Sequence, residues 1–556
     1  MFNFASLKEN KQQLTLLLTK KFSVMNKNKF LQTVMNQSRT ENGALSYLTT
    51  GSICVDQFGK AGSYRDRGLI QVLADQQMLW DENKEFAIKF PFYLRMITRK
   101  TTLGNGKTTE SIQKGLGSRD EAFKRLIWFL INQPELFYAN LWLLPVIGSW
   151  KDLIVLLTMD ESIDRNKVFS IIAEGCQSKS QKDLVKKYLP RIRSNNKCTT
   201  VWAKKTNDIA KDFCKWAGWT CEEYRKFKST GKAHEFQKYI SKQQYDKLEW
   251  NKIPGKALLN LTTGKFLTNH NLTDNYLSWI KEQPVAKFNG YPYELGAKLK
   301  MHRGITVMDM ATNLTIDAQF ENLIQTAKNG FNGNVWCALD TSASMNHRVA
   351  SNITAFDVCI SLGVYFATLN QGAFHKNVVM FDNTSKIKQL EGSFSQMYTD
   401  IISEKTAWGG TNFMSVIEEI IRVRKNNPNV PLEDYPTTLL VVSDMQFNAP
   451  SNENETNYEC MKNKLSEVFP KDFVDNMKFI WWNVCGRQTN DVPSTLDNGG
   501  CYFLSGFDGS IITLLLDNGN EIIDEETGDK KMPTMLDFIN IALNQEVLQL
   551  IETEVK

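Results

Sequence analysis

Apolar residues recur every three to four positions through the first 330 residues of the chain. This spacing puts them on one face of a helix, so it predicts a succession of amphipathic helices. Turns that contain glycine separate the segments, and no alternating strand pattern of any length interrupts them. We therefore expect an N-terminal all-α domain over residues 1–330, built as a HEAT-like helical repeat. The clearest helical segments span residues 66–80, 83–100, 119–133 and 149–159.

Beyond residue 330 the pattern changes to short apolar runs separated by helical stretches. Runs that are apolar almost throughout are typical of strands buried on both faces, and their alternation with helices indicates a parallel, doubly wound sheet. We therefore expect an α/β domain over residues 331–556. The runs are NVWCALD at 334–340, NVVMFD at 377–382, TTLLVVSD at 437–444 and KFIWWNVC at 478–485.

Nothing in the sequence indicates a membrane or secreted protein. The longest charge-free apolar stretch, residues 136–150, has 15 residues, and a membrane span needs about 20. It predicts a buried helix instead. The N-terminus lacks the parts of a signal peptide. The ten cysteines form no CxxC pair, as is usual for reduced thiols. We expect a cytoplasmic monomer that does not contact a membrane.

Charge divides the chain at the same place as the hydrophobic pattern. Residues 1–330 hold 50 Lys and Arg against 31 Asp and Glu, a net charge of +19. Residues 331–556 hold 16 against 30, a net charge of −14. This asymmetry predicts different partners for the two domains, with a polyanion for the basic one.

A group of oxygen-bearing side chains follows the first predicted strand. Asp340, Ser342 and Ser344 alternate with small residues, Thr411 follows a Gly-Gly turn, and Asp444 ends a later strand. Because the carboxyl ends of parallel strands meet at one edge of a sheet, Asp340, Asp382 and Asp444, which each end an apolar run, are expected to lie at that edge. Carboxylate and hydroxyl oxygens suit Mg²⁺, or Mn²⁺ or Ca²⁺ in its place. The alternative is that Asp340 caps a helix and the serines are turn residues.

The densest basic run spans residues 179–205, with nine Lys and Arg against one acidic residue. Tyr188 and Trp202 lie within it. Basic groups follow phosphates and aromatic faces stack on unpaired bases, so the run predicts an RNA-binding segment. The alternative is an ordinary solvated helix face. The residues that we predict to bind nucleic acid are Lys186, Lys187, Arg191, Arg193, Lys197, Lys204 and Lys205.

Enzymatic motifs are weak or missing. Residues 101–110 end like a phosphate-binding loop, but Thr101 stands where its first glycine is required, and a helical pattern rather than a strand precedes it. We interpret this segment as a basic loop between helices. Nuclease chemistry usually needs several clustered carboxylates, and the predicted metal site offers two. We therefore expect no catalytic residues.

The two halves together resemble a known family. A basic helical domain followed by D-x-S-x-S, GGTNF at 409–413 and VVSDMQF at 441–447 is similar to the Ro autoantigen, or TROVE, proteins. Further resemblance lies in TENGALSYLTTGSICVDQFGKAGSYRDR at 40–67, GSWKDLIVLL at 148–157 and KKYLPRIRSN at 186–195. The C-terminal half then resembles a von Willebrand factor A domain, whose metal-ion-dependent adhesion site matches the five oxygen-bearing residues.

The resemblance implies a ring-shaped helical domain that binds misfolded or small non-coding RNA, including single-stranded ends. It also implies an A domain with a divalent metal that captures a carboxylate from a protein partner. A protein-interaction scaffold that uses the metal without nucleic acid is the alternative. We attach no function of the family to the acidic segment 521–531.

Overall fold

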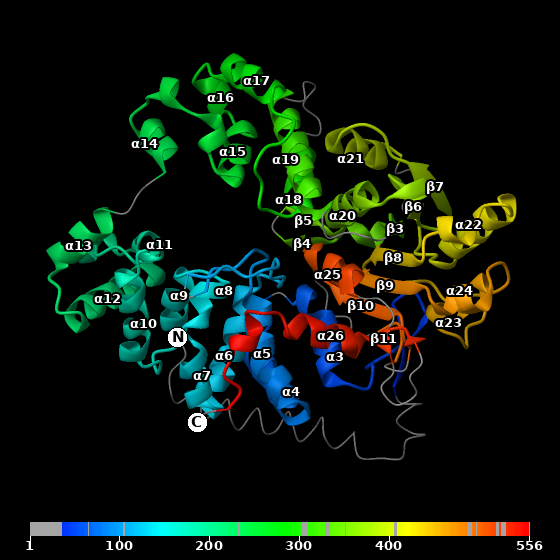
Figure 1. Ribbon diagram of the computed structural model, residues 1–556, viewed down its shortest axis with the longest axis horizontal. Coiled ribbons are helices and arrows are strands. Elements are labelled where there is room, and N and C mark those ends of the chain that lie inside the picture. The colour runs from blue at the N-terminus through cyan, green and yellow to red at the C-terminus, as the bar shows by residue number, and fades with distance from the viewer. Residues whose placement is uncertain are drawn as a thin grey trace. The chain divides into compact units, whose positions relative to one another are not determined.

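The change of hydrophobic pattern near residue 330 coincides with a change from helices to parallel strands in the computed structural model (Figure 1). The structure describes residues 36–554 apart from 65, 104–105, 231–233, 302–309, 329–333, 351, 405–408, 486–491, 496–497, 519–521 and 524–529. The expected order of a helical region followed by an α/β region is confirmed.

Contacts divide the described chain into two units, and each unit is assembled from separated segments. We call them the helical unit, which takes in Arg65–His234 and Asn540–Lys556, and the sheet unit, which takes in Lys29–Tyr64 and Glu235–Ile539. The domain boundary expected near residue 330 stays a prediction.

The helical unit is a series of short helices whose apolar faces pack together. The helices predicted from periodicity are present as α4, α5, α6 and α9. The unit comprises α4 (Leu69–Glu82), α5 (Lys84–Arg95), α6 (Arg119–Asn132), α7 (Pro134–Asn140), α8 (Leu143–Ile147), α9 (Lys151–Met159), α10 (Arg165–Gln177), α11 (Lys182–Tyr188), α12 (Val201–Trp216) and α13 (Cys221–Ser229).

Residues 136–150 do not form the single buried helix expected. The chain makes α7 and α8 with a break at Leu141–Trp142. At the end of α7 the side chain of Asn140 bonds the backbone of Glu552 through both its amide nitrogen and its oxygen, at 2.9 and 2.8 Å. This pair of bonds fastens the C-terminal segment to the helical unit at the end of α7.

A buried ion cluster explains the GSWKDL phrase. Asp152 is fully buried and accepts bonds from Arg95 Nε at 2.7 Å and Arg119 Nε at 2.8 Å. A Cβ on Gly148 would lie 2.2 Å from Asp152 Oδ2 and 2.7 Å from the Arg95 guanidinium. The phrase is therefore structural, because the glycine makes room for a buried charge that needs both arginines.

The loop between α5 and α6 has no feature of a nucleotide site in its described part. Arg99 pairs with Gln113 and Thr102 with Thr108 as antiparallel bridges. No helix begins directly after Thr108, because α6 starts at Arg119. The segment is the inter-helix loop that the sequence predicted.

The sheet unit contains a six-stranded sheet in the order β10-β9-β8-β3-β6-β7. All neighbours are parallel except β7, which is antiparallel to β6 at one edge. The four strands predicted from apolar runs are present, and β7 and β10 are additional. The strands are β3 (Val335–Asp340), β6 (Asn377–Phe381), β7 (Ser385–Gln389), β8 (Thr438–Ser443), β9 (Lys478–Asn483) and β10 (Cys501–Ser505).

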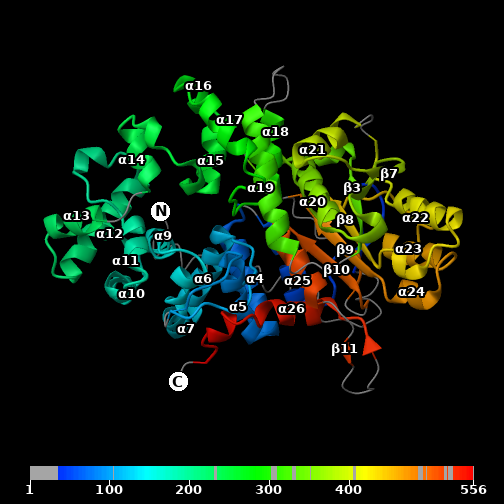
Figure 2. The same cartoon turned by 45° about the horizontal axis from the view of Figure 1, so that its top comes forward.

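Helices cover both faces of this sheet (Figure 2). On one face α20 packs along β3 and contacts α21, and on the other α22 and α23 pack together. Most of α20 is buried, which its strongly apolar sequence predicts. These elements are α20 (Ala355–Leu369), α21 (Phe394–Ser403), α22 (Met414–Asn426), α23 (Asn457–Leu465), α24 (Lys471–Asp475), α25 (Ser510–Asn518) and α26 (Met535–Leu543), with the short strands β4 (Arg348–Ala350) and β5 (Ile353–Thr354).

The last helices of the N-terminal half belong to the sheet unit. The pair α18 and α19 packs against α20 and α21. Asp317 on α19 accepts bonds from Ser395 N at 2.8 Å and Ser395 Oγ at 2.9 Å at the start of α21. The group comprises α14 (Glu235–Ser241), α15 (Gly255–Thr262), α16 (Phe266–Asn269), α17 (Thr273–Lys281), α18 (Pro292–Met301) and α19 (Met310–Lys328).

Residues 36–64 also belong to the sheet unit, although they come before the helical unit in the chain. They form a hairpin of β1 (Gln37–Arg39) and β2 (Leu45–Tyr47), then α3 (Ile53–Lys60), which packs on the edge strand β10. The approach is close, because a Cβ on Gly62 would lie 1.8 Å from Ser505 O. This segment therefore covers the β10 edge of the sheet.

Three further sequence features can be compared with the structure. No helix in the described part of the chain is long and apolar enough to cross a bilayer. All ten cysteines are free thiols, and nine of them are buried. Of the acidic segment 521–531, the described residues form β11 (Ile522–Ile523) and β12 (Lys530–Lys531).

Candidate metal centre and basic surface

The order of the strands reverses direction at one point of the sheet, between β3 and β8. After β3 the chain continues on one side through β6 and β7, and then returns to β8 on the other side of β3. In a doubly wound sheet the crevice at such a reversal, beyond the carboxyl ends of the strands, is where ligands bind. Asp340 ends β3, and Asp444 follows β8 directly. The two predicted carboxylates therefore flank the reversal.

Asp340 is fully buried, and both of its carboxylate oxygens accept hydrogen bonds. Oδ1 accepts from Ser342 N at 2.9 Å, and Oδ2 accepts from the hydroxyl of Ser443 at the end of β8. Ser342 Oγ in turn lies 3.1 Å from Ser344 Oγ. Three of the predicted ligands therefore occupy one turn, and Ser443 ties that turn to the neighbouring strand.

The alternative, that Asp340 caps a helix and the serines are turn residues, stays open, since Asp340 Oδ1 accepts from the backbone N–H two residues on, as in a turn. Ser342 precedes the short helix Ala343–Asn346, but its side chain makes no capping bond there. Its hydroxyl pairs with Ser344 instead. Capping would direct the hydroxyl at a free backbone N–H of the helix.

The second carboxylate lies close enough to Asp340 to affect its ionisation. Burial raises the pKa of Asp340, and the nearby charge of Asp444 raises it further. Asp444 is itself buried and accepts from Gln446 N at 3.2 Å. Two carboxylates in a buried position repel each other, and a divalent cation between them would relieve that repulsion.

Thr411 reaches the same group of loops through its backbone. Its carbonyl accepts from Asn448 N at 2.9 Å, four residues beyond Asp444, and its N–H donates to Asn448 Oδ1 at 3.3 Å. One turn earlier, Gly409 O accepts from Ala343 N at 3.4 Å. The loops that carry all five predicted ligands are thus bonded to one another.

Side chains with amide groups support these loops, and no motif in the sequence indicates them. Asn383, after β6, accepts from Gly410 N at 2.7 Å through Oδ1, and its carbonyl accepts from Asn412 Nδ2 at 3.1 Å. Asn457 Nδ2 donates to Asn448 O at 3.2 Å. Their contacts run between loops that are far apart in the chain, so periodicity and spacing could not identify them.

The donor set fits a hard cation held partly by hydroxyl groups. Across the residues that the structure describes, no cluster of three or more His, Cys, Asp or Glu side chains is suited to a metal. A site made of Asp340, Asp444 and three hydroxyl residues would satisfy Mg²⁺, which accepts oxygen ligands and retains several waters. Whether these residues bind a metal stays a prediction.

The seven predicted nucleic-acid-binding residues differ in their surroundings. Lys186 is buried, donates to Thr230 Oγ1 at 2.9 Å and lies over the Phe227 ring. Lys205 is partly buried and donates to Thr158 O at 2.9 Å. These two lysines hold helices together. The remaining five, which are exposed, are Lys187, Arg191, Arg193, Lys197 and Lys204.

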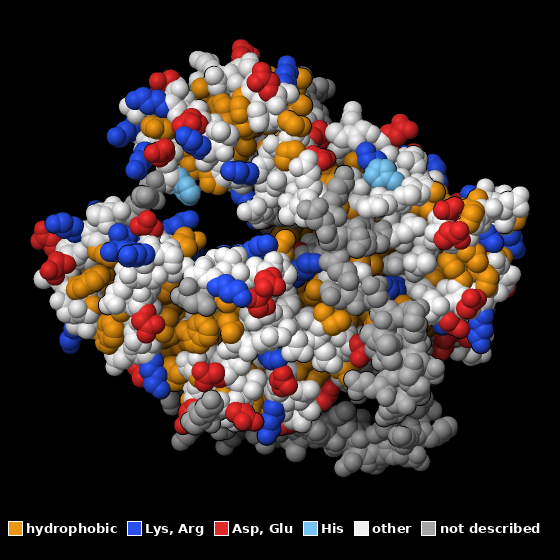
Figure 3. All heavy atoms as spheres, viewed as in Figure 1, with side chains coloured by type: hydrophobic (Ala, Val, Ile, Leu, Met, Phe, Trp, Pro, Cys, Tyr) orange, Lys and Arg blue, Asp and Glu red, His pale blue; other side chains and the backbone are white. Residues whose placement is uncertain are grey.

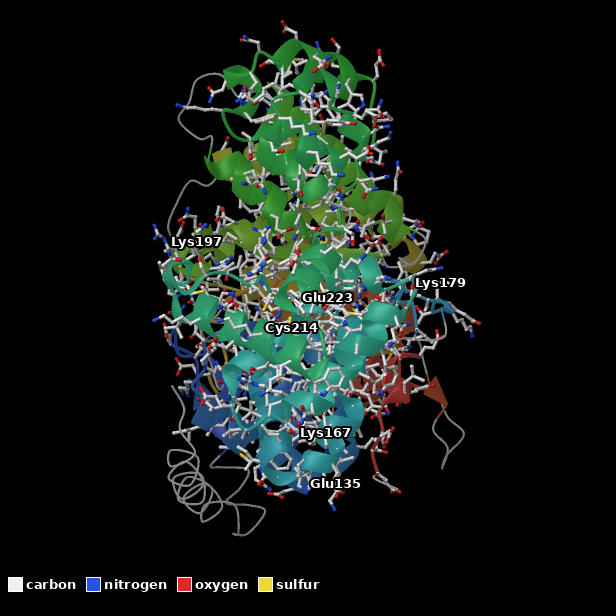
Figure 4. All side chains as sticks on the ribbon, turned by 90° about the vertical axis from the view of Figure 1, so that its left-hand side faces the viewer. Glu135, Lys167, Lys179, Lys197, Cys214 and Glu223 are labelled. Carbon is white, nitrogen blue, oxygen red and sulfur yellow. The ribbon has the colours of Figure 1, made fainter. Side chains whose placement is uncertain are left out.

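The basic run of residues 179–205 lies on more than one side of the helices. Figure 4 places Lys179 and Lys197 on opposite sides of the helical group, so the basic run does not form one continuous stripe. On the face drawn in Figure 3, basic, acidic and apolar side chains are interspersed over α10 to α13. Trp202, which belongs to the same run, is 45% exposed.

One basic neighbour was missed by the sequence analysis. Lys228, on α13, donates to Lys186 O at 2.8 Å. Burial lowers its pKa, and the charge of Arg191 lowers it further, so the two cations lie near each other. A local excess of positive charge of this kind favours an anionic partner.

Comparisons with known proteins give a family match for part of the chain and a relative for most of it. Residues 335–545 match a family described as a domain of unknown function, DUF7788. The uncharacterized protein L728 of Acanthamoeba polyphaga mimivirus is 22% identical over 515 residues, which cover 86% of this chain and 85% of that protein. Similarity therefore extends over both units.

A solved structure is also similar. The crystal structure of the Deinococcus radiodurans RO (RSR) protein matches with a TM-score of 0.37 and 12% identity, over 84% of this chain and 92% of that one. Membership of the Ro family stays a prediction from the sequence.

Proposed function

We propose that this protein is a non-enzymatic RNA-binding protein whose helical unit contacts single-stranded or small non-coding RNA. The observation that supports it best is the segment 187–204. Five cationic side chains there are exposed, none forms an ion pair with an acidic residue that the structure describes, and Trp202 of the same segment is also exposed. Cations of this kind neutralise phosphates, and an exposed indole stacks on an unpaired base.

The distribution of charge points to the same unit. Residues 65–234 hold 30 Lys and Arg against 19 Asp and Glu, a net charge of +11. Residues 235–330 hold 12 against 9, a net charge of only +3. The excess charge of the N-terminal half is therefore concentrated in the unit that carries the exposed basic segment.

The experiment is equilibrium binding of the full chain to a fluorescently labelled single-stranded RNA at several salt concentrations. We expect the logarithm of the affinity to fall linearly with the logarithm of salt, by about 0.7 for each phosphate neutralised. A variant with Lys187, Arg191, Arg193, Lys197 and Lys204 all changed to Gln should bind more weakly and with a shallower slope. Equal affinity and slope for the two proteins would exclude this surface as the RNA site.

We further propose that the sheet unit binds Mg²⁺, Mn²⁺ or Ca²⁺ through Asp340, Ser342, Ser344, Thr411 and Asp444. The bound cation would supply an open coordination position for a carboxylate of a protein partner. Asp340 and Asp444 would contribute the negative charge, while the hydroxyl groups would set the spacing. The support is that the loops carrying all five residues are bonded together at the reversal of the strand order.

Metal binding is tested apart from RNA by titrating EDTA-treated protein with Mn²⁺ and following free Mn²⁺ by electron paramagnetic resonance. Asp340→Asn keeps the shape of the side chain and removes its charge, so it should abolish tight binding. An unchanged titration would exclude the site. The second candidate function, a scaffold without nucleic acid, requires partner capture that EDTA and Asp340→Asn both prevent while RNA binding is absent.

A further inference from the structure

The turn between β1 and β2 bonds directly to the loop that follows Asp444. Thr40 Oγ1 donates to Phe447 O at 2.6 Å. Glu41 N donates to Gln446 Oε1 at 2.7 Å, and Asn42 Nδ2 donates to Gln446 O at 2.5 Å. These residues belong to the TENGALSY phrase, which the proposed function does not use. They lie more than 400 positions away in the chain from their partners.

The loop that receives these bonds is strained. Met445, between Asp444 and Gln446, has a φ of +67°, a backbone conformation that residues other than glycine rarely adopt. Such a residue keeps this conformation only where its surroundings hold it. Ser443 Oγ accepts from Met445 N at 3.0 Å on one side, and the β1–β2 turn holds Gln446 on the other.

The same turn connects to the loop of Thr411. Gly43 pairs with Asn448 as an antiparallel bridge. Asn448 is the residue whose backbone and side chain bond the backbone of Thr411. The turn therefore contacts the segment that joins two of the predicted ligand loops, those of Asp444 and Thr411.

We propose that the turn Thr40–Gly43 is a positioning element of the metal centre. It holds the 444–448 loop so that Asp444 and Thr411 keep the spacing that a divalent cation requires. None of its residues is a ligand. This inference rests on the proposed metal site, and it assigns to the N-terminal segment a role in that site which neither its sequence position nor the donor set indicates.

The test compares two substitutions at one position. Thr40→Val removes the hydroxyl that donates to Phe447 O and accepts from Ala44 N, with little change in size. Thr40→Ser keeps both bonds. Thr312→Val is the matched control, because Thr312 Oγ1 is buried and donates to Thr262 O at 2.9 Å, which joins α19 to α15. Mn²⁺ affinity by paramagnetic resonance and the midpoint of thermal unfolding are measured for each full-length protein.

We expect Thr40→Val to weaken Mn²⁺ binding by about threefold to tenfold, the equivalent of one hydrogen bond that positions a ligand loop. Thr40→Ser should retain the wild-type Mn²⁺ affinity. Thr312→Val should lower the midpoint of thermal unfolding but leave the Mn²⁺ affinity unchanged. Wild-type affinity in Thr40→Val, or an equal loss in Thr312→Val, would overturn the proposal. If Thr40→Val does not fold, Gln446→Met, which removes the acceptor for Glu41 N, is judged by the same two criteria.

Asp340→Asn separates the two levels of inference. If the wild type does not bind Mn²⁺, or if Asp340→Asn binds it equally well, the metal site itself is wrong. If Asp340→Asn abolishes binding while Thr40→Val leaves it intact, only the positioning role is wrong.

Discussion

The hydroxyl of Ser443 donates a hydrogen bond to Asp340 Oδ2, joining the carboxyl ends of the adjacent strands β8 and β3. Both side chains are fully buried. The bond compensates part of the cost of placing a carboxylate in the interior, and it orients Asp340 relative to the loop that carries Asp444.

Ser443→Ala should therefore destabilise the metal-free protein by about 1–3 kcal/mol, because a buried carboxylate oxygen loses its donor. Chemical unfolding in the presence of EDTA measures this change. Ser361→Ala is the control, because the Ser361 hydroxyl is also buried and bonds Asp357 O within α20. Equal losses for the two variants would contradict a special role for Ser443.

Gly62→Ala should destabilise the sheet unit by about 1–3 kcal/mol or more, because the new Cβ meets backbone at the β10 edge. Circular dichroism during thermal unfolding measures the effect. Gly264 is the matched control, because a Cβ there has a single ordinary contact of 3.5 Å, with Asn260 O. A stable Gly62→Ala protein would show that α3 does not need its close approach to Ser505.

Substitutions of two basic residues in the same run should affect different properties, stability in one case and RNA binding in the other. Lys186→Met should lower stability by about 1–3 kcal/mol, since it removes the donor to Thr230. Arg193→Gln should leave stability unchanged but weaken RNA binding and reduce the salt slope by about 0.7. Unfolding curves and RNA titrations of both variants check this. Loss of stability in Arg193→Gln would show that its exposed guanidinium has a structural partner.

Asp317 predicts a pH dependence of the contact between α19 and α21. Burial raises the pKa of Asp317 above its ordinary value, although bonds from Ser395 and Ser393 act in the opposite direction. The native state then binds the proton more tightly than the unfolded state. Stability from this group is therefore present below the ordinary pKa and is lost as pH rises through the raised value.

Asp317→Asn should remove that part of the pH dependence. The free energy of unfolding, measured from pH 4 to pH 7 for both proteins, should show a smaller decline with rising pH in the variant. Parallel curves would contradict the assignment to Asp317.

Thiol chemistry should distinguish one cysteine from the other nine. Cys221 is exposed at the start of α13, whereas the others are buried. Burial also raises the pKa of several of them, to about 12 for Cys337 and to about 11 for Cys501, which leaves little reactive thiolate. Iodoacetamide should label Cys221 alone in the native protein, and mass spectrometry of the digested protein checks this. Early labelling of a buried cysteine would indicate local opening.

Much of the fold followed from the pattern of apolar residues. The runs ending at Asp340 and Asp444 predicted β3 and β8 to within one residue, because strands buried on both faces are continuously apolar. Strand β7 was missed because SKIKQ has one apolar residue among polar ones, as suits an exposed edge. Residues 136–150 form two helices where the apolar composition predicts one, because composition does not show where a helix ends.

The candidate site was predictable only as a set of residue types. Spacing within D-x-S-x-S and the position of Asp444 indicated convergence, since parallel strands share an edge. Ser443, Gln446 and Asn448 were not identified, because their roles depend on which loops meet. The exposure of Arg193 and the burial of Lys186 were equally hidden, because both belong to one basic run.

The position of residues 36–64 has a consequence for biosynthesis. They leave the ribosome before the helices of residues 65–234, yet Ser63 N bonds Ser505 Oγ and Thr40 bonds Phe447, more than 400 residues later in the chain. Contacts over such separations form late and slowly. This segment must therefore wait, without its partners, while residues 65–234 of the helical unit and most of the sheet unit are synthesised. Expression should therefore depend more on chaperones when this interval is longer, since segments that wait for distant partners are exposed to misassembly.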